Sequence, residues 1–155
     1  NLFTVMKKFV FVVMLAFLWA GCSDNTSSRS EWSGPTLSEV DQTEDGIYVS
    51  PDDQAPFSGQ VGGEMPGQSG QFVEGELIDG KWNGPVKIYQ TDDEGREYLR
   101  KASEYRNGVL VGSAYTYYPD GGTLAEIRYT DEGLVDCAIN YDEDGNVTRN
   151  SCSDT

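Results

Sequence analysis

Apolar residues alternate with polar or small residues along the second half of the chain, most clearly between residues 104 and 122. Successive side chains of a β-strand point to opposite faces of a sheet, so this alternation predicts strands with one apolar face. Two short segments interrupt the pattern, Arg106-Asn107-Gly108 and Pro119-Asp120-Gly121. Each ends in a glycine, which takes a positive φ at no steric cost, as a type I turn followed by a bulge requires. The stretch therefore predicts two strands, each followed by a three-residue loop.

The same design recurs along the chain and sets the expected register of the strands. The residues expected to oppose each other across the loops are Tyr105 and Val109, Tyr118 and Gly122, Thr130 and Leu134, and Asp142 and Asn146. The loop at residues 92–95 is expected to be longer. Opposed residues share a face, so one face is expected to be apolar and the other polar. The expected apolar face carries Val109, Val111, Tyr115, Tyr117, Ala125, Ile127, Tyr129, Val135, Cys137, Ile139, Tyr141 and Val147. The predicted fold is all-β: an elongated, twisted antiparallel sheet of consecutive β-hairpins.

Four tyrosines of the expected apolar face form a candidate binding face: Tyr115, Tyr117, Tyr129 and Tyr141. Tyrosine is enriched at protein interfaces because its ring provides contact area while its hydroxyl tolerates water. An open sheet without a covering layer would leave these rings accessible to a partner protein or to a second copy of the chain. The alternative is an internal face, closed by the twist of the sheet and by residues 46–73.

The N-terminal region predicts an export signal. Lys7 and Lys8 precede an uninterrupted apolar run over residues 9–19, which is too short to span a bilayer comfortably. We therefore expect a signal peptide over residues 1–21, with the true start of the protein at Met6.

The end of that signal, Leu18-Trp19-Ala20-Gly21-Cys22, resembles the lipobox of bacterial lipoproteins. The resemblance implies that Cys22 carries a lipid anchor and that the protein resides in the cell envelope. Ser23 resembles the signal for outer-membrane sorting in Gram-negative bacteria. The alternative is an ordinary cleaved signal with a chance cysteine.

Composition divides the rest of the chain. Residues 22–45 are polar and are expected to form a flexible tether behind the lipidated cysteine. Residues 46–150 are expected to form the β domain, and residues 151–155 a tail.

Charge and residue types restrict the function. Without Lys7 and Lys8 the mature chain has 9 basic and 26 acidic residues, so its net charge is 9 − 26 = −17. Such a polyanion is repelled by phosphate backbones, which argues against nucleic-acid binding. The chain contains no histidine, and its carboxylates fall mainly in loops. We therefore expect neither an enzyme nor a bound metal or cofactor.

Cys137 and Cys152 are candidates for a disulfide, which export permits. The expected register places Cys137 opposite Ser151 and Cys152 on the other face. A bridge would therefore need a bulge, or a tail that turns back after Asn150. A free, buried Cys137 and an exposed Cys152 are the alternative.

Glycines and tyrosines recur with a spacing of 24 to 28 residues, at Gly80, Gly108 and Gly133, at Gly95, Gly121 and Gly145, and at Tyr89, Tyr117 and Tyr141. The segment Tyr105-Arg106-Asn107-Gly108 with Gly112 resembles the core of the MORN-variant repeat, and residues 48–59 resemble the entry segment of YwqK-like proteins. The resemblance implies a repeat protein that binds a protein partner. YwqK-like proteins are commonly named as antitoxin components, so an immunity-like role against an exported toxin is a second implication. Binding of lipid or glycan is a third.

Overall fold

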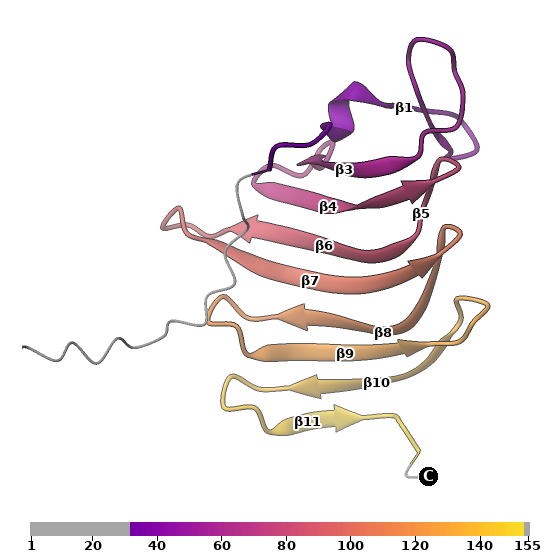
Figure 1. The fold of residues 1–155 in the computed structure, drawn as a ribbon. Coiled ribbons are helices and arrows are strands. Elements are labelled where there is room, and N and C mark those ends of the chain that lie inside the picture. The colour runs from indigo at the N-terminus through magenta and orange to yellow at the C-terminus, as the bar shows by residue number, and fades with distance from the viewer. Residues whose placement is uncertain (1–31, 154–155) are drawn as a thin grey trace, which may run out of the picture.

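The computed structural model describes residues 32–153, and its main element is one open antiparallel sheet (Figure 1). In this part of the chain the sheet contains nine strands, in the order β11-β10-β9-β8-β7-β6-β4-β3, with β5 paired to the end of β4. The strands are β3 (Gly59–Glu64), β4 (Gln71–Ile78), β5 (Lys81–Trp82), β6 (Gly84–Thr91), β7 (Glu97–Arg106), β8 (Val109–Tyr117), β9 (Thr123–Tyr129), β10 (Val135–Tyr141) and β11 (Val147–Asn150). The predicted all-β sheet of consecutive hairpins is confirmed.

Residues 32–58 run along the β3 end of the sheet (Figure 1). They contain a 3-10 turn, η1 (Leu37–Glu39), and the two-stranded pair β1 (Asp41–Gln42) and β2 (Tyr48–Val49). The backbone N–H of Gly62 donates to the carbonyl of Pro35 over 3.1 Å, so this segment pairs with the exposed edge of β3. A Cβ on Gly62 would lie 2.8 Å from the ring of Trp32, so only a glycine permits this approach. Ordered structure therefore begins before residue 46, within the stretch expected to be a tether.

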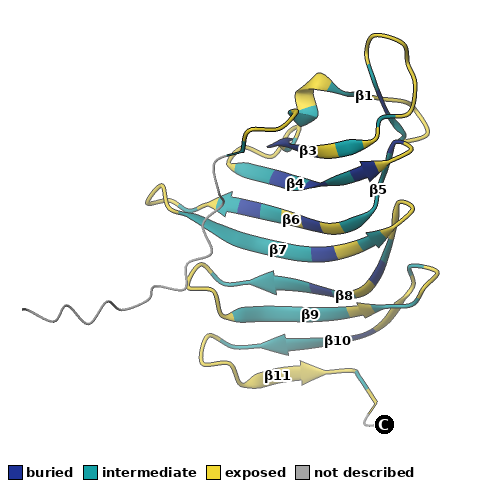
Figure 2. Cartoon of the chain, in the orientation of Figure 1, coloured by how far each residue is buried: buried dark blue, intermediate teal, exposed yellow. Residues whose placement is uncertain are grey.

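The core lies on one face of the sheet, mainly between β3 and β8 (Figure 2). Its buried residues on these strands are Val61, Val73, Leu77, Val86, Tyr89, Ser103, Val111 and Ala114. Leu77 and Val61 are fully buried, and each contributes about 1.5–3 kcal/mol of transfer free energy. The N-terminal segment covers part of this core, because Tyr48 packs edge-on against Trp82, which lies opposite Leu77. By contrast, every residue of β11 is exposed.

Two predictions about the loops are wrong. Arg106, not Tyr105, pairs with Val109, so Asn107 and Gly108 form a two-residue turn. Both residues have positive φ, 51° and 81°, as a type I′ turn requires. The loop at residues 92–95 is not longer than the others, because the N–H of Asp92 bonds to the carbonyl of Arg96 and leaves three residues between them.

The three-residue loops predicted after Tyr118, Thr130 and Asp142 are confirmed. In each loop the N–H of the first flanking residue bonds to the carbonyl of the residue four positions later, over 2.8–2.9 Å. Beyond these loops, however, the predicted register is wrong. Each following strand contains one extra residue that opposes nothing on its neighbour: Leu124, Asp136 and Thr148. Bulges of this kind increase the right-handed twist of a strand pair and shift all later pairs by one residue.

Candidate binding surfaces

The predicted apolar face is wrong, because the bulges place its tyrosines on two faces. Tyr115 lies opposite Glu126, whereas Ala114 lies opposite Ile127. Tyr129 alternates with Ile127 on β9 and therefore belongs to the face of Ala114, not to the face of Tyr115. The four tyrosines are all partly exposed, but they do not form one surface.

The Tyr115 surface combines an aromatic stack with an ion pair. The rings of Tyr115 and Tyr117 stack with centroids 6.3 Å apart and an interplanar angle of 22°. On the neighbouring strand β9, Arg128 Nε donates to Glu126 Oε1 over 2.9 Å. We use the name Tyr115 surface for the half-exposed or exposed residues Ser113, Tyr115, Tyr117, Glu126, Arg128 and Tyr141.

Hydrogen bonding and burial set the electrostatics of the Tyr115 surface. The Arg128 guanidinium, with a smaller contribution from the Ser113 hydroxyl 3.1 Å away, holds the pKa of Glu126 below its ordinary value. The same hydrogen bond raises the pKa of Arg128, and the tyrosine hydroxyls of Tyr115 and Tyr141 add smaller contributions. Burial raises the pKa of Tyr117. At neutral pH the surface therefore presents neutral phenols beside one charged guanidinium.

Tyr129 belongs to a second aromatic group, which the alternation of the sequence does not predict. Burial raises the pKa of Tyr105, and Tyr129 and Tyr48 contribute further, so the three side chains are electrostatic neighbours. Tyr48 in turn contacts Trp82 with ring centroids 5.6 Å apart. This group links the N-terminal segment to the sheet, which indicates a structural role for Tyr129.

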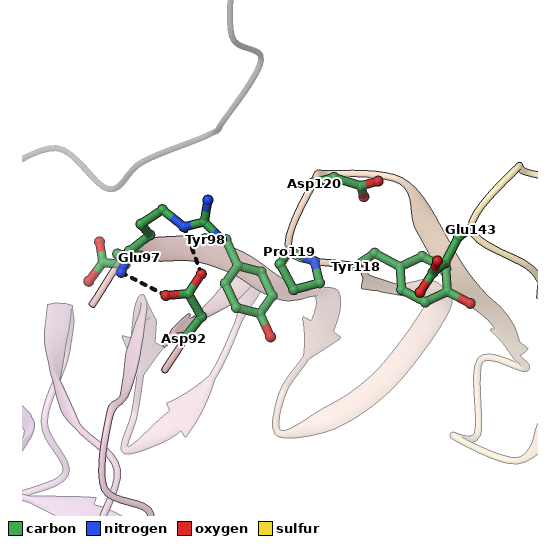
Figure 3. Close-up of a pocket in the computed structure, with 8 residues that line it drawn as sticks. Asp92, Glu97, Tyr98, Tyr118, Pro119, Asp120 and Glu143 are labelled. Atoms are coloured by element: carbon green, nitrogen blue, oxygen red, sulfur yellow. Dashed lines mark hydrogen bonds and ion pairs between the residues drawn. The ribbon is translucent and has the colours of Figure 1, made fainter. Parts of the chain in front are cut away.

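A cavity of about 350 Å³ lies at the sheet edge formed by three of the loops (Figure 3). It is lined by Asp92, Arg96, Glu97, Tyr98, Tyr118, Pro119, Asp120 and Glu143. In Figure 3 the rings of Tyr98 and Tyr118 lie on either side of Pro119. The Tyr118 hydroxyl donates to the carbonyl of Tyr141 over 2.9 Å, which fixes its ring. We call this site the loop-edge cavity.

Cys137 and Cys152 form a disulfide with a Cα–Cα distance of 4.9 Å. The extra residue Thr148 makes this geometry possible, because it shifts the register so that Asn150 lies opposite Ile139. The N–H of Cys152 then donates to Asn150 Oδ1 over 2.8 Å and turns the tail toward β10. Of the predicted site residues, Cys22 lies outside the described part of the chain.

The described residues offer no conventional catalytic or metal-binding chemistry. The chain has no histidine. Within residues 32–153, no three Cys, Asp or Glu side chains are grouped so that they could hold a metal ion. No helix in that range is long and apolar enough to cross a membrane.

Comparison with known proteins assigns no family. No family model matches the chain, and no curated protein matches it. Among solved structures, S. aureus TarM in complex with fondaparinux, alpha-GlcNAc-glycerol and UDP matches 58% of this chain and 18% of its own, with 10% identity and a TM-score of 0.31. A second TarM structure matches 60% of this chain and 19% of its own, with 11% identity and a TM-score of 0.33. Likeness at this level carries neither a family nor an activity to the chain.

Proposed function

We propose that the chain is a non-enzymatic, lipid-anchored envelope protein whose sheet binds a partner protein through the Tyr115 surface. The observation that carries the proposal is the stacked pair Tyr115 and Tyr117 beside Arg128, on a sheet face that reaches solvent. Tyrosine and arginine dominate the binding energy of many protein interfaces. The MORN-like spacing of the sequence and the lipobox-like motif at Cys22 support a repeat protein held at the envelope.

The arrangement of the Tyr115 surface suits protein recognition. The stacked rings are already ordered against each other, so binding would cost little additional side-chain entropy. Glu126 is 13% exposed in its side chain and Arg128 is 49% exposed, so the carboxylate orients the guanidinium while leaving much of it accessible. A partner that provides a carboxylate or an aromatic ring could contact this guanidinium directly.

Site-specific photocrosslinking in envelope fractions tests the proposal. A photoreactive phenylalanine at Tyr117 should form a covalent product with a partner protein, and the same substitution at Tyr129, on the other face, is the matched control. Arg128→Gln should weaken the Tyr117 product. A Cys22→Ser arm tests the anchor, because it should release the protein from the membrane fraction.

Identical products at both positions, or no product at Tyr117, would refute the Tyr115 surface as the contact site. A wild-type protein without an acyl group would refute the anchor alone. The identity of the crosslinked protein separates a structural envelope partner from an exported toxin, as the hypothesis of an immunity-like role requires.

A further inference from the structure

The loop-edge cavity has a chemistry different from that of the Tyr115 surface. Its walls are the rings of Tyr98 and Tyr118 and the side chain of Pro119, and its rim is acidic. It lies where the loops β6–β7, β8–β9 and β10–β11 reach the same edge of the sheet (Figure 1). Its residues therefore come from segments more than 40 positions apart in the chain.

The rim carries an excess of negative charge. Asp92, Glu97, Asp120 and Glu143 provide four carboxylates against the single guanidinium of Arg96, so the lining has a net charge of 1 − 4 = −3. Arg96 donates to Asp92 over 2.9 Å and pairs with Glu94 over 3.1 Å. Two carboxylates thus already neutralise this guanidinium, which leaves the cavity with a negative potential that favours a cation.

Aromatic walls add a second attraction for the same kind of ligand. The face of a tyrosine ring carries negative charge density and attracts a guanidinium within about 6 Å of its centre. The bond from the Tyr118 hydroxyl to the carbonyl of Tyr141 holds one wall in place before any ligand arrives. A planar guanidinium can stack on such a ring and bond to carboxylates at its edge at the same time.

We infer that the loop-edge cavity binds the guanidinium of an arginine side chain on a partner protein. The inference rests on the proposed protein-binding function and adds a second contact point with defined chemistry. Rings and carboxylates of the cavity select an arginine over its uncharged isostere, citrulline, which has nearly the same shape.

A titration of the full chain with a synthetic peptide tests this inference. The probe is an acetylated, amidated (Gly-Arg) repeat of about eight residues, a length that presents several arginines along the sheet edge. Its control peptide has citrulline at each arginine position. Chemical shifts of the backbone amides of residues 92–98 and 118–120 should move with the arginine peptide and not with the citrulline peptide. Binding should weaken as salt is added.

Two variants of the cavity and one matched control complete the test. Glu143→Gln removes one charge from the rim, and Tyr98→Leu removes an aromatic wall while keeping an apolar side chain. Each should weaken the affinity about threefold, and both together about tenfold. Glu132→Gln makes the same charge change in the exposed loop at the opposite sheet edge, so it should leave the affinity unchanged. Far-UV circular dichroism verifies that each variant is folded.

Equal affinity of the two peptides, or no shift in the cavity amides at millimolar peptide, would overturn the inference. The inference also fails if Glu143→Gln and Glu132→Gln weaken binding equally, since the peptide would then respond only to overall charge. If Tyr117 still crosslinks a partner while the peptide fails, the cavity is refuted and the Tyr115 surface stands. If the peptide binds and Tyr117 forms no product, the reverse holds.

Discussion

The disulfide between Cys137 and Cys152 should determine whether the last hairpin stays closed. The two cysteines are 15 residues apart, and closing a loop of this length removes about 3 kcal/mol of chain entropy from the unfolded state. β11 lies at the edge of the sheet and has no buried residue, so side-chain burial adds little to hold it. The cross-link is therefore the main restraint on this strand.

We expect a Cys137→Ala/Cys152→Ala variant to lose up to about 3 kcal/mol of unfolding free energy in urea. The loss should be local first. Hydrogen exchange should accelerate at the amides of β11 and its partners on β10, while β4 and β6 keep their protection. Cys137 is itself buried, so the double variant also loses packing there. Reduction of the wild-type protein, which breaks the bond without changing a side chain, is the control. Unchanged exchange in β11 after reduction would refute the reasoning.

Two further measurements test the core and the loops. Leu77→Ala should cost about 2–5 kcal/mol in urea unfolding because Leu77 is fully buried, whereas Leu134→Ala, at a side chain 67% exposed, should cost under about 0.5 kcal/mol; equal costs would place the core wrongly. Acid should destabilise the protein, because backbone N–H groups of Asn146 and Asp144 hold the pKa of Asp142 below its ordinary value. A depressed pKa in the folded state stabilises the protein above the ordinary value of about 3.9, and this stabilisation is lost as the pH falls through the folded pKa. Thermal melts between pH 7 and pH 2 should show it, and Asp142→Asn should make the decline shallower; a parallel decline in both proteins would contradict this origin.

Local turn chemistry explains which parts of the fold can be predicted from the sequence. The loops after Tyr118, Thr130 and Asp142 depend on a glycine at the residue that needs a positive φ, and each has one. The prediction for Asn107–Gly108 is wrong although the signal is present, because Asn-Gly is the preferred pair for a two-residue type I′ turn. The prediction of a tether up to residue 45 is wrong because composition does not register the packing of Trp32 against Gly62.

The bulges cannot be predicted from residue type because they have none in common. Leu124, Asp136 and Thr148 are apolar, acidic and polar, respectively. What they share is position, since each is the third residue after the glycine that closes its loop: 121 to 124, 133 to 136 and 145 to 148. A bulge at a constant place in each repeat indicates that the backbone of the repeat, rather than any one side chain, requires the extra residue.

These bulges also create the candidate binding surface. Without the extra residue Leu124, the register set by the loop would place Ala125 opposite Tyr115 and leave Glu126 and Arg128 on the other face. With it, Tyr115 lies opposite Glu126, and the ion pair of Glu126 with Arg128 comes to lie beside the tyrosine stack. The same shift places Tyr129 with Tyr105 and Tyr48 on the side that packs against the N-terminal segment. One inserted residue on β9 therefore separates the tyrosines available to a partner from the tyrosine that supports the fold, and a prediction of this surface from sequence has to locate the bulge first.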